Sequence, residues 1–153
     1  MANIASLRGT SNIIMRSISS LRRGDTSWKS KEGGKQMKEN KLADLSMDFS
    51  VEIINLVKQL KEKRETIISN QIGRSGTSIG ANIHEAKYAQ GKKDFISKLE
   101  IALKEASETG YWLELLYKTD YIDEETFKSI SSKCATIRIM LIASCRTAKE
   151  NGK

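Results

Sequence analysis

The amino-acid sequence predicts an all-α protein that folds as an antiparallel, up-down-up-down four-helix bundle. Two observations lead to this fold class. The 153 residues include no proline, the residue that helix interiors tolerate least. From Leu42 onward, apolar residues recur every three or four positions, which is helical spacing, and there is no sustained alternation typical of strands. Four amphipathic helices with short connections form a bundle most economically.

Four segments carry this spacing, and each is expected to bury one apolar face. The first, about 45–63, ends in the charged run 61–65, and the second, about 66–89, is expected to stop at Gly91. The third covers about 92–118, and Asp123 is expected to cap the fourth. The residues predicted to face the core are Leu45, Phe49, Ile53, Leu56, Leu60, Ile68, Ile72, Ser75, Ile79, Ile83, Ala86, Phe95, Leu99, Ala102, Leu103, Ala106, Gly110, Leu113, Leu116, Phe127, Ile130, Cys134, Ile137, Leu141 and Cys145.

The net charge of +7 is unevenly distributed along the chain. Residues 1–36 carry seven basic and two acidic side chains, residues 37–127 carry thirteen and sixteen, and residues 128–153 carry six and one. Two basic ends therefore flank a mildly acidic body, a pattern that favours polyanionic partners such as nucleic acid or an anionic membrane surface. The alternative is that the charge only keeps a small protein in solution.

Composition divides the chain into a Ser/Arg/Gly-rich basic arm, residues 1–36, and a bundle, residues 37–153. The arm is typical of a disordered or spurious stretch before Met37, of a nucleic-acid-binding tail, or of an organellar transit peptide. The longest apolar run, 139–143, has five residues, whereas a membrane-spanning helix needs about twenty. We therefore expect a cytoplasmic protein with no membrane partner.

The sequence contains few side chains that could catalyse a reaction or bind a metal ion. His84 is the only histidine. The adjacent Glu85 points about 100° away from it on a helix, so the two do not form an oriented acid–base pair. Cys134 and Cys145 are expected to be small apolar core residues, not a disulfide or metal ligands. We expect no catalytic residues, no metal site and no cofactor, and hence a protein that is not an enzyme.

The segment 73–80 contains three glycines, of which Gly76 and Gly80 lie four positions apart. It fits no phosphate-binding motif, because no strand precedes it and the apolar spacing continues through it. Three glycines in a helix cost about 1 kcal/mol each relative to alanine, so we expect close packing of another helix to compensate.

A polar stripe runs beside this apolar face. Its members are Arg74, Ser78, Asn82 and Glu85, at spacings that place them in one line along a helix. Such a line is typical of a seam between helices or subunits, where amides and hydroxyls exchange hydrogen bonds and Arg pairs with a carboxylate. The alternative is a functional pocket.

Two motifs resemble a known bacterial family. They are Arg74-Ser75-x-x-Ser78-Ile79-x-x-Asn82-Ile83-x-Glu85-Ala86 and Glu105-Ala106-x-Glu108-Thr109-x-Tyr111-Trp112-Leu113. They resemble the four helix bundle protein family, which includes proteins encoded by intervening sequences in large-subunit ribosomal RNA genes. That family is similar to the accessory variability determinant proteins of diversity-generating retroelements. The resemblance covers about residues 37–149.

The resemblance implies a four-helix protomer that assembles into a ring-like homopentamer without known catalysis. In the retroelement relatives, a basic surface binds nucleic acid and the reverse transcriptase. Carried over to this sequence, the polar stripe supplies packing or subunit-contact residues. The motifs do not fix basic contact residues, so the nucleic-acid-binding candidates rest on charge alone: Lys128, Lys133, Arg138, Arg146 and Lys149.

Two functions follow as hypotheses. The leading one is a non-enzymatic, oligomeric scaffold that binds RNA or DNA through its basic surface, as an accessory to a reverse transcriptase of a diversity-generating retroelement. The alternative is a structural protein-interaction module of the ribosomal RNA intervening-sequence type, without nucleic-acid binding. Tyr111 and Trp112 either stack on bases or pack in the interior.

Overall fold

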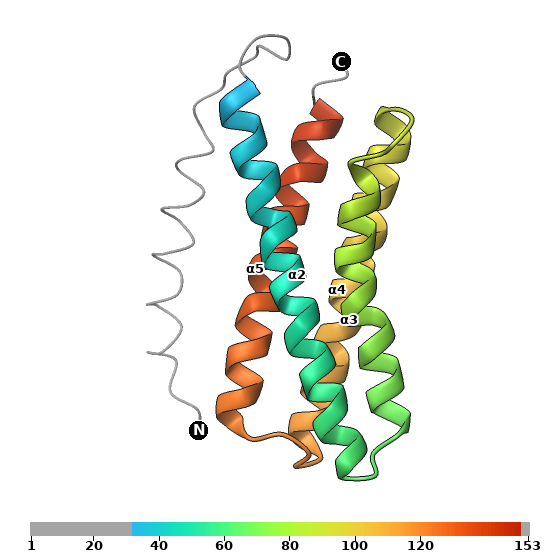
Figure 1. The fold of residues 1–153 in the computed structure, drawn as a ribbon, viewed down its shortest axis with the longest axis vertical. Helices are drawn as coiled ribbons and strands as arrows, with labels where there is room; N and C mark the ends of the chain where they lie inside the picture. The colour runs from blue at the N-terminus through green and yellow to red at the C-terminus, as the bar shows by residue number, and fades with distance from the viewer. Residues whose placement is uncertain (1–31, 151–153) are drawn as a thin grey trace. The chain divides into compact units, whose positions relative to one another are not determined.

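The computed structural model describes residues 32–150, and within that range it contains four helices and no strand. The helices are α2 (Glu32–Glu62), α3 (Ile67–Ala86), α4 (Lys92–Lys118) and α5 (Glu124–Glu150). Successive helices run in opposite directions and lie alongside one another (Figure 1). The predicted all-α four-helix bundle is therefore confirmed. Of the predicted basic arm, residues 1–31 lie outside the described residues, and residues 32–36 form the first turns of α2.

Two helix ends differ from the sequence prediction. The first helix begins at Glu32 and not near Leu45, although Gly33 and Gly34 disfavour helix. The second ends at Ala86, and Gly91 is the N-cap residue of α4 instead of a stop for α3. The prediction for Gly91 was wrong because glycine occurs on both sides of helices. After a helix it adopts a positive φ, whereas Gly91 has an extended backbone and precedes α4.

Carboxylates define the starts of α3 and α5. The buried Glu65 side chain accepts hydrogen bonds from the backbone N–H groups of Ile67, Ile68 and Ser69 at 2.9, 2.8 and 2.6 Å. The carboxylate of Asp123 accepts one from the N–H of Thr126 at 2.8 Å, which confirms the predicted cap. These bonds satisfy N–H groups that a helix leaves without partners in its first turn.

The core lies between the four helices. It buries Phe49 and Ile53 from α2, Ile72 and Ile79 from α3, and matching aliphatic side chains from α4 and α5. Most of the predicted core positions are buried; Leu45, Ile68, Phe95, Leu103 and Phe127 are partly buried at its edge. Gly110, also predicted to face the core, is half-buried beside open space. Polar groups inside the core are paired, since the Thr109 hydroxyl donates to Ser75 Oγ at 2.9 Å between α4 and α3.

The glycines of α3 allow α2 to pack closely against it. A Cβ atom added at Gly76 would lie 2.8 Å from the side chain of Ile53, and one at Gly80 would lie 3.0 Å from Ser50 Oγ and 3.4 Å from the backbone oxygen of Ser46. A contact of 2.8 Å would force Ile53 to shift, and one of 3.0 Å would require Ser50 to give way slightly. The expected close packing is confirmed, and the segment 73–80 lies within α3.

No helix in the described part of the chain is long and apolar enough to cross a membrane.

Candidate nucleic-acid interface

The five basic candidates all project from α5, but they point to different sides of it. Lys133 forms an ion pair with Glu52 on α2, and Lys149 pairs with Glu100 on α4 at 2.6 Å. These two lysines therefore lie on opposite flanks of α5, where it meets its two neighbours. The structure does not gather the five candidates on one face.

Lys128 and Arg146 instead pair within their own helix. The Lys128 ammonium lies 2.5 Å from Glu124, and Arg146 Nε lies 2.8 Å from Glu150. Their side chains are 71% and 80% exposed, the largest values among the paired bases of α5. Exposed pairs of this kind are weak and are screened by salt, so a phosphate can compete with the carboxylate for the base.

Charge pairing shifts the protonation equilibria of these groups in the expected direction. The hydrogen bond from Lys149, followed by its charge, lowers the pKa of Glu100, and the same contact raises the pKa of Lys149. Hydrogen bonding to Glu124 raises the pKa of Lys128. All of these bases therefore remain charged at neutral pH, while their partners cancel part of the positive field.

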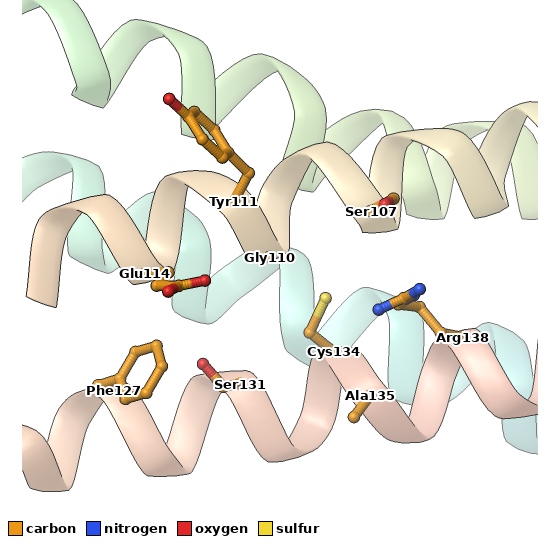
Figure 2. A pocket seen from close by; sticks show the side chains of 9 residues that line it. All are labelled: Ser107, Gly110, Tyr111, Glu114, Phe127, Ser131, Cys134, Ala135 and Arg138. Carbon is orange, nitrogen blue, oxygen red and sulfur yellow. The ribbon is translucent and has the colours of Figure 1, made fainter.

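Arg138 differs from the other four candidates, because it makes no ion pair with any residue of the range 41–150. Its side chain extends from α5 into the space between α5 and α4 (Figure 2). There it borders an open depression of about 400 Å³, which we call the α4–α5 groove. The groove is lined by Ser107, Gly110, Tyr111 and Glu114 on α4 and by Phe127, Ser131, Cys134, Ala135 and Arg138 on α5.

The aromatic candidates lie at the edge of this region. Tyr111 is 59% exposed, and its ring points away from α5 (Figure 2). Trp112 packs against the core, and its indole N–H donates to Glu108 Oε1 at 3.0 Å. The two rings meet edge to face, with 4.9 Å between their centroids. Trp112 thus follows the interior-packing alternative, and Tyr111 presents an open ring.

The polar stripe of α3 lies along the seam with α4. Glu85 accepts a hydrogen bond from Lys98 at 2.5 Å, and the Asn82 amide donates to the backbone oxygen of Ser78 at 2.9 Å. Arg74 is close enough to Glu105 to lower its pKa, although partial burial and then Glu108 act more strongly and raise it. Arg74 was expected to pair with a carboxylate at a seam, and the ion pair that crosses this seam joins Glu85 to Lys98 of α4.

The remaining candidates for chemistry are placed as packing or surface residues. His84 is exposed and its ring lies 5.4 Å from that of Tyr88. Cys134 and Cys145 are both buried free thiols, and burial raises the pKa of Cys134 to about 11. Within the described residues, no three His, Cys, Asp or Glu side chains are grouped to hold a metal ion.

The sequence interpretation missed a second surface feature, on the side of α2 that faces away from the core. Met47, Val51 and Ile54 are 63%, 54% and 42% exposed. Their spacings of four and three place them in one line, and Asp44 and Lys58 extend that line at either end. We call these five residues the α2 outer stripe. Its signal was present in the sequence as a second apolar periodicity, opposite the predicted core face.

The protein is an all-helical bundle with an apolar outer stripe on α2 and a partly neutralised basic helix, α5. Comparison with known proteins gives its family. The family model for the 23S rRNA-intervening sequence protein matches residues 38–143. The chain therefore belongs to the 23S rRNA-intervening sequence protein family.

One solved structure supports the same assignment. It is a protein with unknown function from the S23 ribosomal protein family of Bacteroides thetaiotaomicron VPI-5482. The two sequences are 53% identical, the TM-score is 0.70, and the match covers 71% of this chain and 98% of that one. A comparison with curated proteins finds no match to the chain.

Proposed function

We propose that this protein is a non-enzymatic scaffold that self-associates and binds nucleic acid through the exposed bases of α5. The observation that carries the proposal is the pair of outward surfaces on one rigid bundle: apolar side chains on α2 and basic side chains on α5. Aligned apolar side chains exposed on a small protein mark an interaction site. Basic residues that are exposed and only weakly paired suit a polyanion.

Self-association is supported by the α2 outer stripe. Three large apolar side chains in one line remain in water in the isolated protomer. Burying them against another surface is favourable by about 25 cal/mol for each Å² of apolar area. The assembly we propose is a homopentamer, which is the state implied by the family resemblance.

The proposal that the protein is not an enzyme is supported by the surroundings of the histidine, glutamate and cysteine side chains that could act as catalytic groups. His84 lies beside Tyr88 on the surface, and the neighbouring Glu85 is engaged by Lys98. The two thiols are buried, and the raised pKa of Cys134 disfavours the nucleophilic thiolate. None of these groups is arranged as an acid, base or nucleophile.

Nucleic-acid binding would act through counterion release. Lys128 and Arg146 exchange their surface carboxylates for phosphates, and the ions condensed on the nucleic acid are set free. Affinity then falls steeply with salt and depends little on base sequence. RNA and DNA are both candidate ligands, because phosphates are common to them.

The test is a salt series of binding to unrelated RNA and DNA, single-stranded and duplex, with the full chain and a Lys128→Ala/Arg146→Ala variant. For duplex DNA, we expect the double variant to reduce the slope of log affinity against log salt by about 2. Lys118→Ala is the matched control, because Lys118 forms an equivalent exposed pair with Glu114, but on α4. Equal slopes for the double variant and wild type would contradict binding through α5.

An accessory role beside a reverse transcriptase is the more specific form of this proposal. It predicts co-purification of the two proteins and a gene neighbourhood with a reverse transcriptase and a template repeat. A gene located inside a 23S ribosomal RNA gene, with no reverse transcriptase nearby, would contradict that form.

A protein-interaction module without nucleic-acid binding is the second candidate. It is favoured by the ion pairs of the basic helix, since Lys128, Lys133, Arg146 and Lys149 each contact a carboxylate. It predicts no binding to any nucleic acid even at low salt, together with an oligomeric mass.

A further inference from the structure

Acidic, apolar and basic side chains follow one another in that order along the α2 outer stripe. An acidic residue, Asp44, stands at its N-terminal end, the apolar residues Met47, Val51 and Ile54 form its centre, and a basic residue, Lys58, stands at its C-terminal end. At 1.5 Å per residue, the stripe is about 21 Å long. Such a stripe is complementary to a groove with a basic end, a centre of small residues and an acidic end.

The α4–α5 groove has that composition. The small residues Gly110, Ser131 and Ala135 line its centre, whereas the Phe127 ring lies near Glu114 and the Tyr111 ring points away from α5 (Figure 2). A Cβ atom added at Gly110 would meet no atom within 4 Å. Arg138 lies at one end and Glu114 at the other (Figure 2). The volume of about 400 Å³ gives room for several aliphatic side chains between the two charges.

We propose that the α2 outer stripe of one copy of this chain docks into the α4–α5 groove of a second copy. Asp44 then meets Arg138, Lys58 meets Glu114, and Val51 lies over Gly110. The opposite charges at the two ends fix the direction in which the incoming helix runs. Glu114 changes partner on docking, because its exposed pair with Lys118 is weak. This inference rests on the self-association proposed above and identifies its surfaces.

The two surfaces lie on different parts of the protomer. α2 packs against α3 through Gly76 and contacts α5 through Glu52, whereas the groove lies between α4 and α5. Each copy therefore offers one stripe and one groove, and the contact is heterologous. Repetition of such a contact closes into a ring or extends as a chain. Arg138 becomes a subunit-contact residue, and Lys128 and Arg146 remain available for nucleic acid.

Two single substitutions separate the halves of this interface. Val51→Asp places a charge in the exposed stripe and leaves the groove intact. Gly110→Leu fills the groove, where the protomer has open space, and leaves the stripe intact. Both sites lie outside the core, so both variants keep the circular-dichroism spectrum of the wild type. We expect each variant alone to fall to the mass of a single 17.1 kDa chain in light scattering.

Mixing the two variants is the decisive step. The intact groove of Val51→Asp accepts the intact stripe of Gly110→Leu, so an equimolar mixture forms a dimer and nothing larger. If either variant alone remains oligomeric, or if the mixture stays monomeric, the proposed interface is wrong. An oligomeric wild type would still support the proposed scaffold in that case. A monomeric wild type would overturn the scaffold as well.

Charge reversal gives an independent check at the acidic end of the groove. Lys58→Glu and Glu114→Lys should each weaken assembly, and the double variant should restore it. Failure of the double variant to exceed the single variants would contradict the proposed direction of docking.

Discussion

Two carboxylates decide where helices begin in this bundle, and only one of them was predicted. Asp123 could be predicted because an Asp before a helical pattern, followed by acidic residues in the first turn, is a familiar capping signal. Glu65 belongs to the charged run 61–65, in which the sequence gives it no capping role, yet it is 6% exposed and accepts three backbone N–H bonds. The burial of Glu65 depends on the turn at Arg64, whose φ is 61°, and the sequence carries no clear signal for that turn.

The capping role of Asp123 gives a pH-dependent prediction. The N–H of Thr126 lowers the pKa of Asp123, so its contribution to stability is present above the unfolded pKa of about 4 and disappears as pH falls through the lower folded value. Asp123→Ala should lower Tm by more at pH 7 than at pH 2, where the protonated carboxyl is a weaker acceptor. Thermal melts at the two pH values measure this.

Asp123→Asn is the matched control, because its amide oxygen still accepts the cap bond but carries no charge that titrates. At pH 7 its Tm should lie between those of the wild type and Asp123→Ala, because the amide keeps the hydrogen bond and loses the part that depends on charge. A deficit for Asp123→Ala that is unchanged at pH 2 would rule out the capping carboxylate as its cause.

Close packing of α2 on α3 depends on glycine at particular positions, and the sequence predicted a close contact from the spacing of those glycines. Three glycines within a strongly apolar helix indicated a compensating neighbour. The sequence did not identify the neighbour, because residues of α2 such as Ile53 meet α3 only after the chain folds. The early start of α2 was missed for a related reason, since Gly33 and Gly34 oppose helix locally.

Two glycine-to-alanine substitutions should have opposite effects on stability. Gly76→Ala gains helix propensity, but its methyl group would lie 2.8 Å from the fully buried Ile53, so we expect a net loss of about 1–3 kcal/mol. Gly110→Ala meets no atom and should gain up to about 1 kcal/mol. Urea unfolding measures both, and a stabilised Gly76→Ala variant would show that Ile53 can move aside.

For the whole molecule, the sequence predicted the fold class well and the functional surface incompletely. Apolar spacing is local information, and it located the core and the bounds of α4. Cancellation of charge is not local: Lys133 and Glu52, or Lys149 and Glu100, are far apart in the chain and meet only in the bundle. A basic segment in the sequence therefore became a helix whose bases are mostly paired.

The outer surface of α2 shows the opposite case. Its apolar residues have helical spacing that the sequence displays openly, but they were overlooked because one apolar face per helix was enough to explain a bundle. A helix with two apolar faces buries one of them in the core of its own protomer and leaves the other exposed. That excess is the physical reason for expecting an assembly.

The most direct test of the scaffold is the solution mass of the full chain, measured by light scattering across a range of protein concentrations. We predict a discrete mass that is a multiple of 17.1 kDa and that falls to one chain on Val51→Asp substitution. A wild-type mass of one chain at every concentration would contradict it, because the α2 outer stripe would then remain exposed in the functional protein.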